Sequence, residues 1–255
     1  SPPTINNNVI YVGSPDGYLH AVNAVDGSKI WAYAAVGSIY SSPGVSKDGA
    51  IYFGTTGKKF YCLNPDGTKK WEFTSAYELA FSSAAIALNG DVFFGEGNVM
   101  SESGNLFYCL DGETGGKKWE FETGKTIQSS PALDGNGSVY FGSHDKKIYS
   151  LDVESGQKNW EFETGGWIHG SSVVIGGNGN LYIGSDDNNL YCLNTKGQKI
   201  WHFNATESFR GSPVLGDDQM LYIGGGDKKV YALSTINGQK QWEYTTSARV
   251  ETHPS

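Results

Sequence analysis

Residues 142–162 read GSHDKKIYSLDVESGQKNWEF, and residues 224–244 repeat the pattern as GGGDKKVYALSTINGQKQWEY. Halfway between them, residues 184–203 read GSDDNNLYCLNTKGQKIWHF. Each copy contains an apolar run with aromatic residues, then a Gly, and then a Trp four positions after that Gly. A unit that recurs about every 41 residues indicates a repeat architecture.

Six copies of this unit run along the chain. The Trp residues that mark them are spaced by 40, 48, 41, 41 and 41 residues. The Gly four positions before each Trp indicates a turn that needs a positive φ, which Gly adopts without steric cost. The markers are Trp31, Trp71, Trp119, Trp160, Trp201 and Trp242, and their glycines are Gly27, Gly67, Gly115, Gly156, Gly197 and Gly238.

Each repeat carries the signals of four short strands. An apolar run that ends in Gly, such as IYVG or LYIG, is followed by a second run such as FYCL and then by the strand with the Trp. The segment around Ser-Ser-Pro (41–43 and 129–131, with GSP at 211–213) begins the next unit. Four antiparallel strands per repeat are typical of a propeller blade, whose faces are buried by the neighbouring blades.

The prolines near the two ends predict closure of the ring. Pro254 lies 12 residues after Trp242, which is also the spacing from Trp31 to Pro43. Pro2 aligns with Pro43 when both are counted from the Gly that follows them. We therefore predict an all-β, closed six-bladed β-propeller with four antiparallel strands per blade. The alternative is a fragment of a longer array that happens to begin and end at equivalent positions.

Length and charge restrict the class of protein further. The length of 255 residues alone allows one or two domains, whereas the six repeats predict one domain over residues 1–255, and we expect a monomer. A net charge of −8 argues against nucleic acid as a partner, because phosphate binding needs a basic face. No apolar run approaches the roughly 20 residues needed to cross a bilayer. The chain starts without a signal-like apolar region, so we expect any targeting segment to lie outside this sequence.

The cysteines share one place in the repeat. In the other copies the same place holds Ala or Ser, which indicates a slot for a small residue among packed neighbours. Equivalent positions on neighbouring sheets should lie about 10 Å apart, beyond the roughly 7 Å limit for a disulfide. We therefore predict three buried free thiols, at Cys62, Cys109 and Cys192.

The unit L-D-x-x-(T/S)-G-x-K-x-W, seen at residues 110–119 and 151–160, resembles the tryptophan-docking repeat of the pyrroloquinoline quinone (PQQ) propeller family. The resemblance covers the whole chain and implies that the six Trp and six Gly residues interlock the blades. The family includes quinoprotein alcohol dehydrogenases as well as non-catalytic scaffolds and sensor domains. Because many members work in the periplasm or outside the cell, the resemblance implies an extracytoplasmic location.

The resemblance does not extend to the cofactor. The dehydrogenases of this family place a disulfide between adjacent cysteines over the quinone and hold calcium with a Glu, an Asn and an Asp. This chain has no Cys-Cys pair, and no such calcium set can be assigned in it. We expect no cofactor and no metal, and PQQ with calcium is the alternative, because a fold alone does not define a function.

The most variable part of the repeat lies between the Trp strand and the next Ser-Ser-Pro. Strand alternation should turn its variable side chains away from an intervening apolar residue such as Ile39. In a propeller this segment leads to the innermost strand, so we expect the variable residues at one mouth of the central channel. The residues just before the motif are Tyr40, Phe81, Gln128, His169, Arg210 and Glu251, and two positions earlier stand Ser38, Leu79, Thr126, Trp167, Ser208 and Arg249.

An insertion should lie on the same face. Gly95 and Tyr108 are 13 residues apart, where the other copies take 7, so residues 96–105 carry a six-residue insertion. The groups gathered there suit a protein, peptide or glycan ligand. The alternative is a solvated channel mouth whose unlike residues only avoid six like charges. We predict a ligand-binding set of Tyr40, Phe81, Gln128, Trp167, His169, Arg210, Arg249 and Glu251.

Catalysis by the predicted ligand-binding residues is the weaker hypothesis. His169, Arg210 and Glu251 fall in successive blades and could serve as base, anion clamp and acid, or could pair as ordinary ions. The histidines show no close metal spacing. The sequence therefore predicts a non-catalytic binding or scaffold propeller. The alternatives are a PQQ-dependent or sugar-handling oxidoreductase, and a structural accessory or sensor domain of a larger protein.

Overall fold

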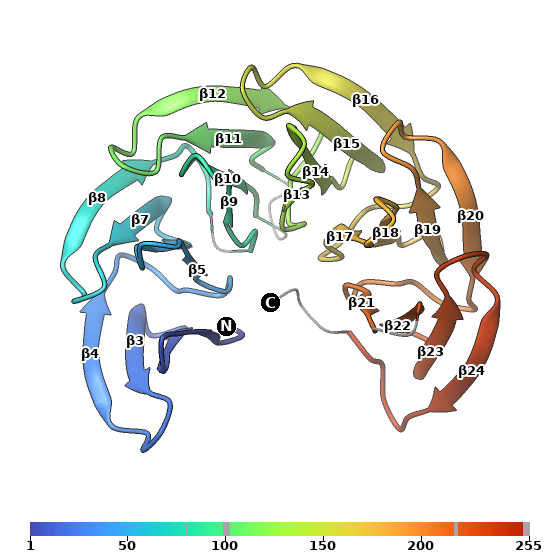
Figure 1. The fold of residues 1–255 in the computed structure, drawn as a ribbon, viewed down its shortest axis with the longest axis horizontal. Helices are drawn as coiled ribbons and strands as arrows, with labels where there is room; N and C mark the ends of the chain where they lie inside the picture. The colour runs from blue at the N-terminus through green and yellow to red at the C-terminus, as the bar shows by residue number, and fades with distance from the viewer. Residues whose placement is uncertain (80, 99–102, 217–218, 252–255) are drawn as a thin grey trace. The chain divides into compact units, whose positions relative to one another are not determined.

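The computed structural model describes residues 1–79, 81–98, 103–216 and 219–251. Within these ranges the chain contains β-strands and no helix, and the strands form six four-stranded antiparallel sheets. The described chain divides into two compact units, residues 1–127 and 128–254, with three sheets in each (Figure 1). The predicted all-β class with four antiparallel strands per blade is confirmed.

In the first unit the strands of each sheet follow one another in chain order. The first sheet is β1 (Thr4–Asn6), β2 (Val9–Gly13), β3 (Tyr18–Asn23) and β4 (Lys29–Ala34). The second is β5 (Gly44–Val45), β6 (Ile51–Gly54), β7 (Lys59–Leu63) and β8 (Lys69–Thr74). The third is β9 (Ala85–Ile86), β10 (Val92–Gly95), β11 (Leu106–Leu110) and β12 (Lys117–Glu122).

The second unit repeats this order. Its first sheet is β13 (Ala132–Leu133), β14 (Ser138–Gly142), β15 (Lys147–Asp152) and β16 (Lys158–Glu163). Next comes β17 (Val174–Ile175), β18 (Leu181–Gly184), β19 (Asn189–Leu193) and β20 (Lys199–Asn204). The last sheet is β21 (Val214–Leu215), β22 (Met220–Gly224), β23 (Lys229–Ser234) and β24 (Lys240–Thr245).

The small-residue slot of the repeat lies opposite the marker Trp. In the second sheet Cys62 pairs with Trp71, and the register between β7 and β8 shifts directly after it. The same shift follows the slot residue in the other five sheets. A bulge increases the local twist of the two strands. A small side chain therefore stands across from the large indole at the point where the strands twist most.

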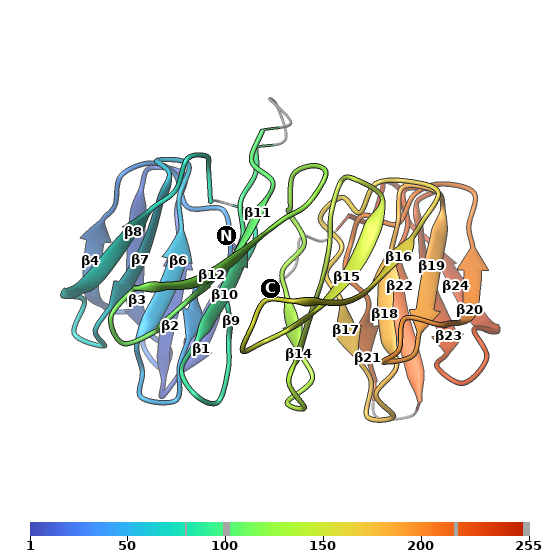
Figure 2. The ribbon, with the colours of Figure 1, turned by 90° about the horizontal axis from the view of Figure 1, so that it is seen from above.

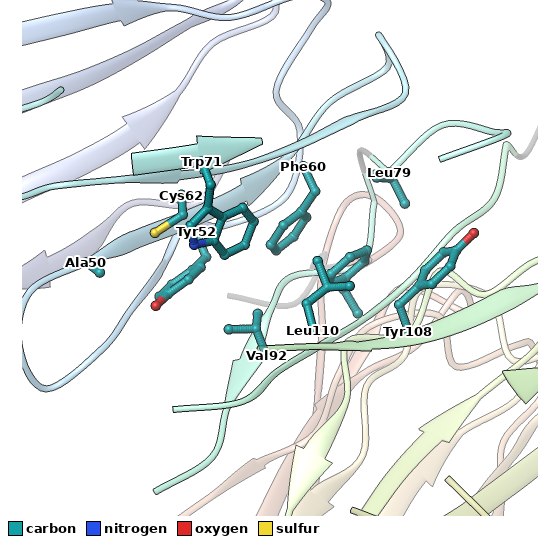
Figure 3. Close-up of a cluster of buried hydrophobic side chains, with 10 residues drawn as sticks. Ala50, Tyr52, Phe60, Cys62, Trp71, Leu79, Val92, Tyr108 and Leu110 are labelled. Carbon is teal, nitrogen blue, oxygen red and sulfur yellow. The ribbon is translucent and has the colours of Figure 1, made fainter. Parts of the chain in front are cut away.

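The indole of each docked Trp interlocks its sheet with the next. Trp71 donates a hydrogen bond from Nε1 to the carbonyl of Gly112, 3.0 Å away, and a Cβ on Gly115 would lie 2.7 Å from the ring. Around it, Phe60 of one sheet stacks on Phe94 of the next with 3.8 Å between ring centroids. Figure 3 shows this cluster, in which Trp71 and Phe60 face side chains of the third sheet.

The same joint recurs between other sheets. In each case the indole Nε1 donates to a carbonyl of the turn that carries the repeat's Gly. The pairs are Trp31 with Pro65 at 3.0 Å, Trp160 with Thr195 at 2.8 Å, and Trp201 with Thr235 at 3.2 Å. At these four joints the interlocking role that the resemblance implied for Trp and Gly is confirmed.

The segments before the first strands, which read Ser-Ser-Pro at residues 41–43 and Ser-Ser-Ala at residues 82–84, link neighbouring strands. The N–H of Gly95 donates to Oγ of Ser82 at 3.1 Å, which ties the segment to the second strand of its own sheet. The N–H of Ser42 donates to Oγ of Ser83 at 3.0 Å, which ties it to the neighbouring sheet. The two serines therefore satisfy backbone donors that short first strands leave free.

The three cysteines are free and buried, as predicted. Burial raises the pKa of the Cys62 thiol to about 11 and that of Cys192 to about 12. Both side chains are therefore neutral in the folded protein at ordinary pH, as expected of small core residues.

Candidate functional site

In both units the variable segment lies beside the hairpin between the second and third strands. The N–H of Ile39 donates to the carbonyl of Ser14 at 3.1 Å, and the N–H of Ile168 donates to that of Ser143 at 3.2 Å. The variable residues therefore emerge at the same ends of the strands as these hairpins, which include the connection that carries the insertion.

The intervening apolar residue anchors each segment. Ile39, Ile168 and Phe209 are fully buried. A Cβ on Gly142 would lie 2.2 Å from Cγ2 of Ile168, so the Gly that ends the second strand makes room for the anchor. The residue after the anchor then points away from the core, and Tyr40 is 42% exposed.

One residue of the predicted alignment is displaced. Leu79 is 1% exposed, and its N–H donates to the carbonyl of Thr55 at 3.0 Å, which is the bond that Ile39 makes with Ser14. Leu79 is therefore the apolar anchor of its segment and not one of the variable residues. One more residue lies between Leu79 and Ser82 than between Ile39 and Ser41, so counting two positions back from Phe81 reaches the anchor and not a variable residue.

The insertion lies beside a variable segment of its own unit. The N–H of Gly97 donates to the carbonyl of Glu78 at 2.9 Å. In Figure 2 the described parts of the β10–β11 connection extend beyond the β6–β7 hairpin. Residues 99–102 of the insertion lie outside the described residues.

The predicted site residues of the first unit form an aromatic pair. Tyr40 and Phe81 stack with their centroids 5.6 Å apart and their planes inclined by 5°.

Gln128, which begins the second unit, is 4% exposed, and its Nε2 has no hydrogen-bond partner within the described ranges. Tyr40 and Phe81 thus offer an apolar contact surface, whereas Gln128 is nearly covered.

Rings from one blade and the segment after it form a stack in the second unit. His144, on the β14–β15 hairpin, is 1% exposed. It stacks on Trp167 with centroids 5.3 Å apart and on His169 with centroids 4.9 Å apart. The structure therefore brings Trp167 and His169 together through a third ring that sequence reasoning did not include.

Arg210 is held by a carboxylate from the β18–β19 hairpin. Its Nε and Nη2 donate to the two carboxylate oxygens of Asp186 at 2.9 and 3.2 Å. The Asp186 side chain is 16% exposed, and its Oδ2 also lies 4.0 Å from Nδ1 of His169. A bidentate pair of this kind fixes the plane of the guanidinium group.

Arg249 has looser partners. Its guanidinium lies 3.4 Å from Glu207 and 3.8 Å from Glu251, and its side chain is 57% exposed. Arg210 pairs with Asp186 and not with Glu251, so the ion pair considered among His169, Arg210 and Glu251 is replaced by one that includes a hairpin residue. We refer to Trp167, His169, Arg210, Arg249 and Glu251, together with His144 and Asp186, as the second-unit rim.

The two residues missed by sequence reasoning share one repeat position. His144 and Asp186 both precede the Asp of the hairpin, in GSHD and GSDD, and Gly226 holds this place in GGGD. The position varies between copies as strongly as the residues that were predicted. That variation was visible in the sequence. The proximity of this repeat position to the rim, however, depends on how the hairpin folds over the neighbouring segment.

The Asp that follows this position in the hairpin forms hydrogen bonds that hold the hairpin next to the rim. The Tyr191 hydroxyl donates to Oδ2 of Asp187 at 2.6 Å, and the N–H of Gly165 donates to the same oxygen at 2.6 Å. Burial, followed by the bond to Asp187, raises the pKa of Tyr191, so the phenol remains a donor. The pair ties the hairpin to the segment that carries Trp167 and His169.

A polar hollow of about 300 Å³ opens at the rim, lined by Asp186, Glu207, Ser208, Arg210 and Arg249 among others. Hollows of about 500 and 530 Å³ lie at turns between first and second strands. Among the described residues no three His, Cys, Asp or Glu side chains are arranged to hold a metal ion.

The fold and the Trp–Gly joints define a tryptophan-docking β-propeller. A family model described as outer membrane protein assembly factor BamB matches residues 1–98, 81–167 and 165–255. The chain therefore belongs to this family, and the predicted PQQ-like resemblance is confirmed.

Curated relatives match parts of the chain. BamB from Yersinia pestis is 33% identical over 114 residues, which are 41% of this chain and 29% of that protein. A beta-alanine-activating enzyme from Danio rerio is 29% identical over 116 residues, which are 44% of this chain and 10% of that protein. The matched regions thus span less than a third of either relative.

A solved structure matches nearly the whole chain. The crystal structure of BamB from Moraxella catarrhalis aligns with a TM-score of 0.78 at 20% identity, over 98% of this chain and 74% of that one. At this identity the likeness establishes the fold, and the six-bladed propeller class is confirmed. No helix within the described ranges is long and apolar enough to cross a membrane.

Proposed function

We propose that this chain is a non-catalytic scaffold that binds another protein through the second-unit rim. The observation that carries the proposal is the gathering of unlike side chains where the repeats differ most. Around the buried and recurrent anchors Ile168 and Phe209, the rim places aromatic, imidazole, guanidinium and carboxylate groups. Such a mixture is typical of protein interfaces, in which Trp and Arg contribute most of the binding energy.

The first unit supplies a second contact surface in this proposal. Tyr40 is 42% exposed and stacks on Phe81, so the pair can cover an apolar side chain of the partner. The name of the family, an outer membrane protein assembly factor, supports a protein as the partner. It also supports an extracytoplasmic location.

Site-specific crosslinking tests the proposal. A photoreactive phenylalanine is placed at Trp167 and, as a control, at Val25, which is 81% exposed on a turn between third and fourth strands. In cells of the source organism, the residue-167 probe should crosslink to a discrete protein that the residue-25 probe does not reach. Equal crosslinking from both positions, or none from residue 167, would contradict binding at the rim.

A combined substitution provides the second measurement. Replacing Trp167, Arg210 and Glu251 by Ala should reduce capture of the crosslinked protein at least tenfold, because aromatic and guanidinium contacts are lost together. The unfolding midpoint should change little, since all three side chains lie outside the core clusters. Unchanged capture by a folded variant would remove the rim from consideration.

A further inference from the structure

The chain has 19 lysine and arginine residues, and only two of them are arginines. Both of these, Arg210 and Arg249, line the same polar hollow of about 300 Å³. The solvated ion pairs on the outer strands use Lys, as in Lys59 with Glu72 and Lys147 with Glu161. The planar guanidinium differs from the ammonium group in binding carboxylates through two parallel hydrogen bonds. The use of Arg is therefore concentrated at one place, which points to a specific ligand.

The two guanidinium groups differ in how firmly they are held. Arg210 makes the bidentate pair with Asp186 at 2.9 and 3.2 Å, and its side chain remains 36% exposed. Its orientation is therefore fixed while part of its donor set faces the hollow. Arg249 lies 3.4 Å from Glu207 in a pair whose side chains are 57% and 49% exposed. Exposed pairs of this kind contribute little, so Arg249 is available to another acceptor.

A position without a side chain lies next to the hollow: a Cβ on Gly226 would lie within 3.4 Å of Glu207 and Ser208, which both line it. Gly226 occupies the hairpin position that holds Asp186 in the preceding blade, and the two make equivalent backbone bonds, to Trp167 and Ser208. Asp186 contacts the rim residues on both sides, His169 and Arg210. By this equivalence a carboxylate at residue 226 would stand between Arg210 and Glu251, whose carboxylate lies 3.8 Å from the guanidinium of Arg249. Position 226 therefore lacks the carboxylate of the preceding blade, and the acidic groups near Arg249 are the more exposed Glu207 and Glu251.

We propose that this hollow binds a carboxylate side chain, Asp or Glu, from an acidic segment of the partner protein, between Arg210 and Arg249. The inference rests on the proposed protein-binding function and identifies the chemistry of its contact. Ser208 lines the same hollow and can contribute a hydroxyl donor. Asp186 acts as a positioning residue because it orients Arg210 without contacting the ligand. The carboxylates of Asp186 and Glu207 nearby repel a doubly charged phosphate more strongly than a singly charged carboxylate.

The test uses the two arginines as their own reporters. In a ¹⁵N spectrum the chain gives two arginine Nε signals, because it contains two arginines. The peptide acetyl-Gly-Glu-Glu-Gly-amide should shift both signals and saturate. Its Gln and Lys counterparts should bind at least about tenfold more weakly, because the charge-assisted bonds are lost. Equal shifts with the Gln peptide, or saturation by inorganic phosphate at lower concentration, would overturn the proposal.

A carboxylate introduced at residue 226 should occupy the place that we propose for the carboxylate of the ligand. Gly226→Asp should move both Nε signals in the direction that the Glu peptide does and abolish peptide binding. Gly226→Asn should block the peptide without that movement, because it fills the space without charge. A Cβ at this position would lie 3.2 Å from Oε2 of Glu207 and 3.3 Å from the carbonyl of Ser208, so small adjustments suffice. Unimpaired peptide binding to both variants would contradict the assigned position.

Substitutions of charged residues near the hollow distinguish residues that orient Arg210 from residues that bind the ligand. Asp186→Asn should speed solvent exchange of the Arg210 Nε proton and weaken the peptide, whereas loss of fold would alter both units. Glu207→Gln should tighten the peptide about two- to threefold, since a weak competing pair is removed. Lys196→Gln removes a charge at an exposed turn and should change nothing. If Glu207→Gln weakens the peptide, the ligand is not an anion.

Failure of the carboxylate-binding proposal can be distinguished from failure of the proposed scaffold function. If protein crosslinking at Trp167 succeeds but Gly226→Asp leaves it intact, the rim binds its partner without this carboxylate contact. If the Glu peptide binds but no protein crosslinks at Trp167, the hollow recognises carboxylates and the scaffold function fails.

Discussion

The indole ring of Trp201 lies directly against Gly238: a Cβ on Gly238 would stand 2.5 Å from Cε3 of the ring. Gly238 also has φ +70°, so Ala there meets both a backbone penalty and a clash. We expect Gly238→Ala to lower the free energy of unfolding by roughly 2–5 kcal/mol, about 1–2 from the backbone and the rest from overpacking. Urea unfolding followed by circular dichroism measures the loss.

Gly27 is the matched control for this substitution. It has φ +73° and closes its turn by the same type of bond, to the carbonyl four residues earlier, but no described atom lies within 4 Å of its Cβ position. Gly27→Ala should therefore cost only the backbone part, about 1–2 kcal/mol. A loss as large as that of Gly238→Ala would show that Gly27 carries a docked side chain in solution.

Trp201 and Trp242 should differ strongly on truncation. Trp201 is 9% exposed and donates to the carbonyl of Thr235, whereas Trp242 is 47% exposed. Trp201→Ala should cost about 3–5 kcal/mol and Trp242→Ala about 2 kcal/mol or less, because the cost follows the packing that is lost. The urea midpoints of the two variants, compared at equal m-values, provide the measurement. Equal losses would contradict the difference in burial.

Glu96 and Tyr108 should form an energetic pair. The Tyr108 hydroxyl donates to Oε2 of the fully buried Glu96 at 3.0 Å. Ser or Thr stands at this position in four other copies, and in two of these an Asp of the hairpin accepts from the Tyr instead, as Asp145 does from Tyr149. Glu96→Ser should cost about 1–3 kcal/mol because it leaves a buried donor without its acceptor.

Removing the donor as well distinguishes this explanation from a loss of packing. Tyr108→Phe in the Glu96→Ser background should recover part of the stability, since no hydroxyl is then left unsatisfied. Thermal melts of the four proteins in this double-mutant cycle give the coupling. Strictly additive losses would mean that the hydrogen bond contributes nothing.

The thiols should resist alkylation in the folded protein. Burial raises the pKa of Cys62 to about 11 and of Cys192 to about 12, from an ordinary value of 9.0. At pH 8 iodoacetamide should therefore modify them only after unfolding, because the thiolate is the nucleophile. Mass spectrometry before and after addition of urea checks this, and rapid modification of the native protein would contradict it.

The same pKa shifts predict a dependence of stability on pH. A folded pKa above the unfolded one gives stability that is complete below pH 9 and is lost as pH rises toward 11 and 12. Replacing Cys62 and Cys192 by Ala, the residue found at this slot in two other copies, should flatten this part of the profile. An unchanged profile would assign the loss to other groups, such as the buried tyrosines.

The candidate site was predictable in part. The position after the apolar anchor could be found from variation between copies, and this identified His169 and Arg210. Asp186 and His144 were missed because hairpin residues 42 positions apart become rim neighbours only through hydrogen bonds between segments. Leu79 was misplaced because an insertion of one residue has no fixed location until a backbone bond selects it.

The repeat, the four strands of each blade and the Trp–Gly joints could be predicted from the residues alone, because they depend on local periodicity and on residues that recur in every copy. Closure into a ring and a single domain over residues 1–255 stay predictions. The pairing of charged side chains, in contrast, depends on the folded arrangement of the chain. Arg210 takes Asp186 as its partner because two strand ends far apart along the chain are held side by side, and a Coulomb interaction depends on that distance and not on order in the sequence.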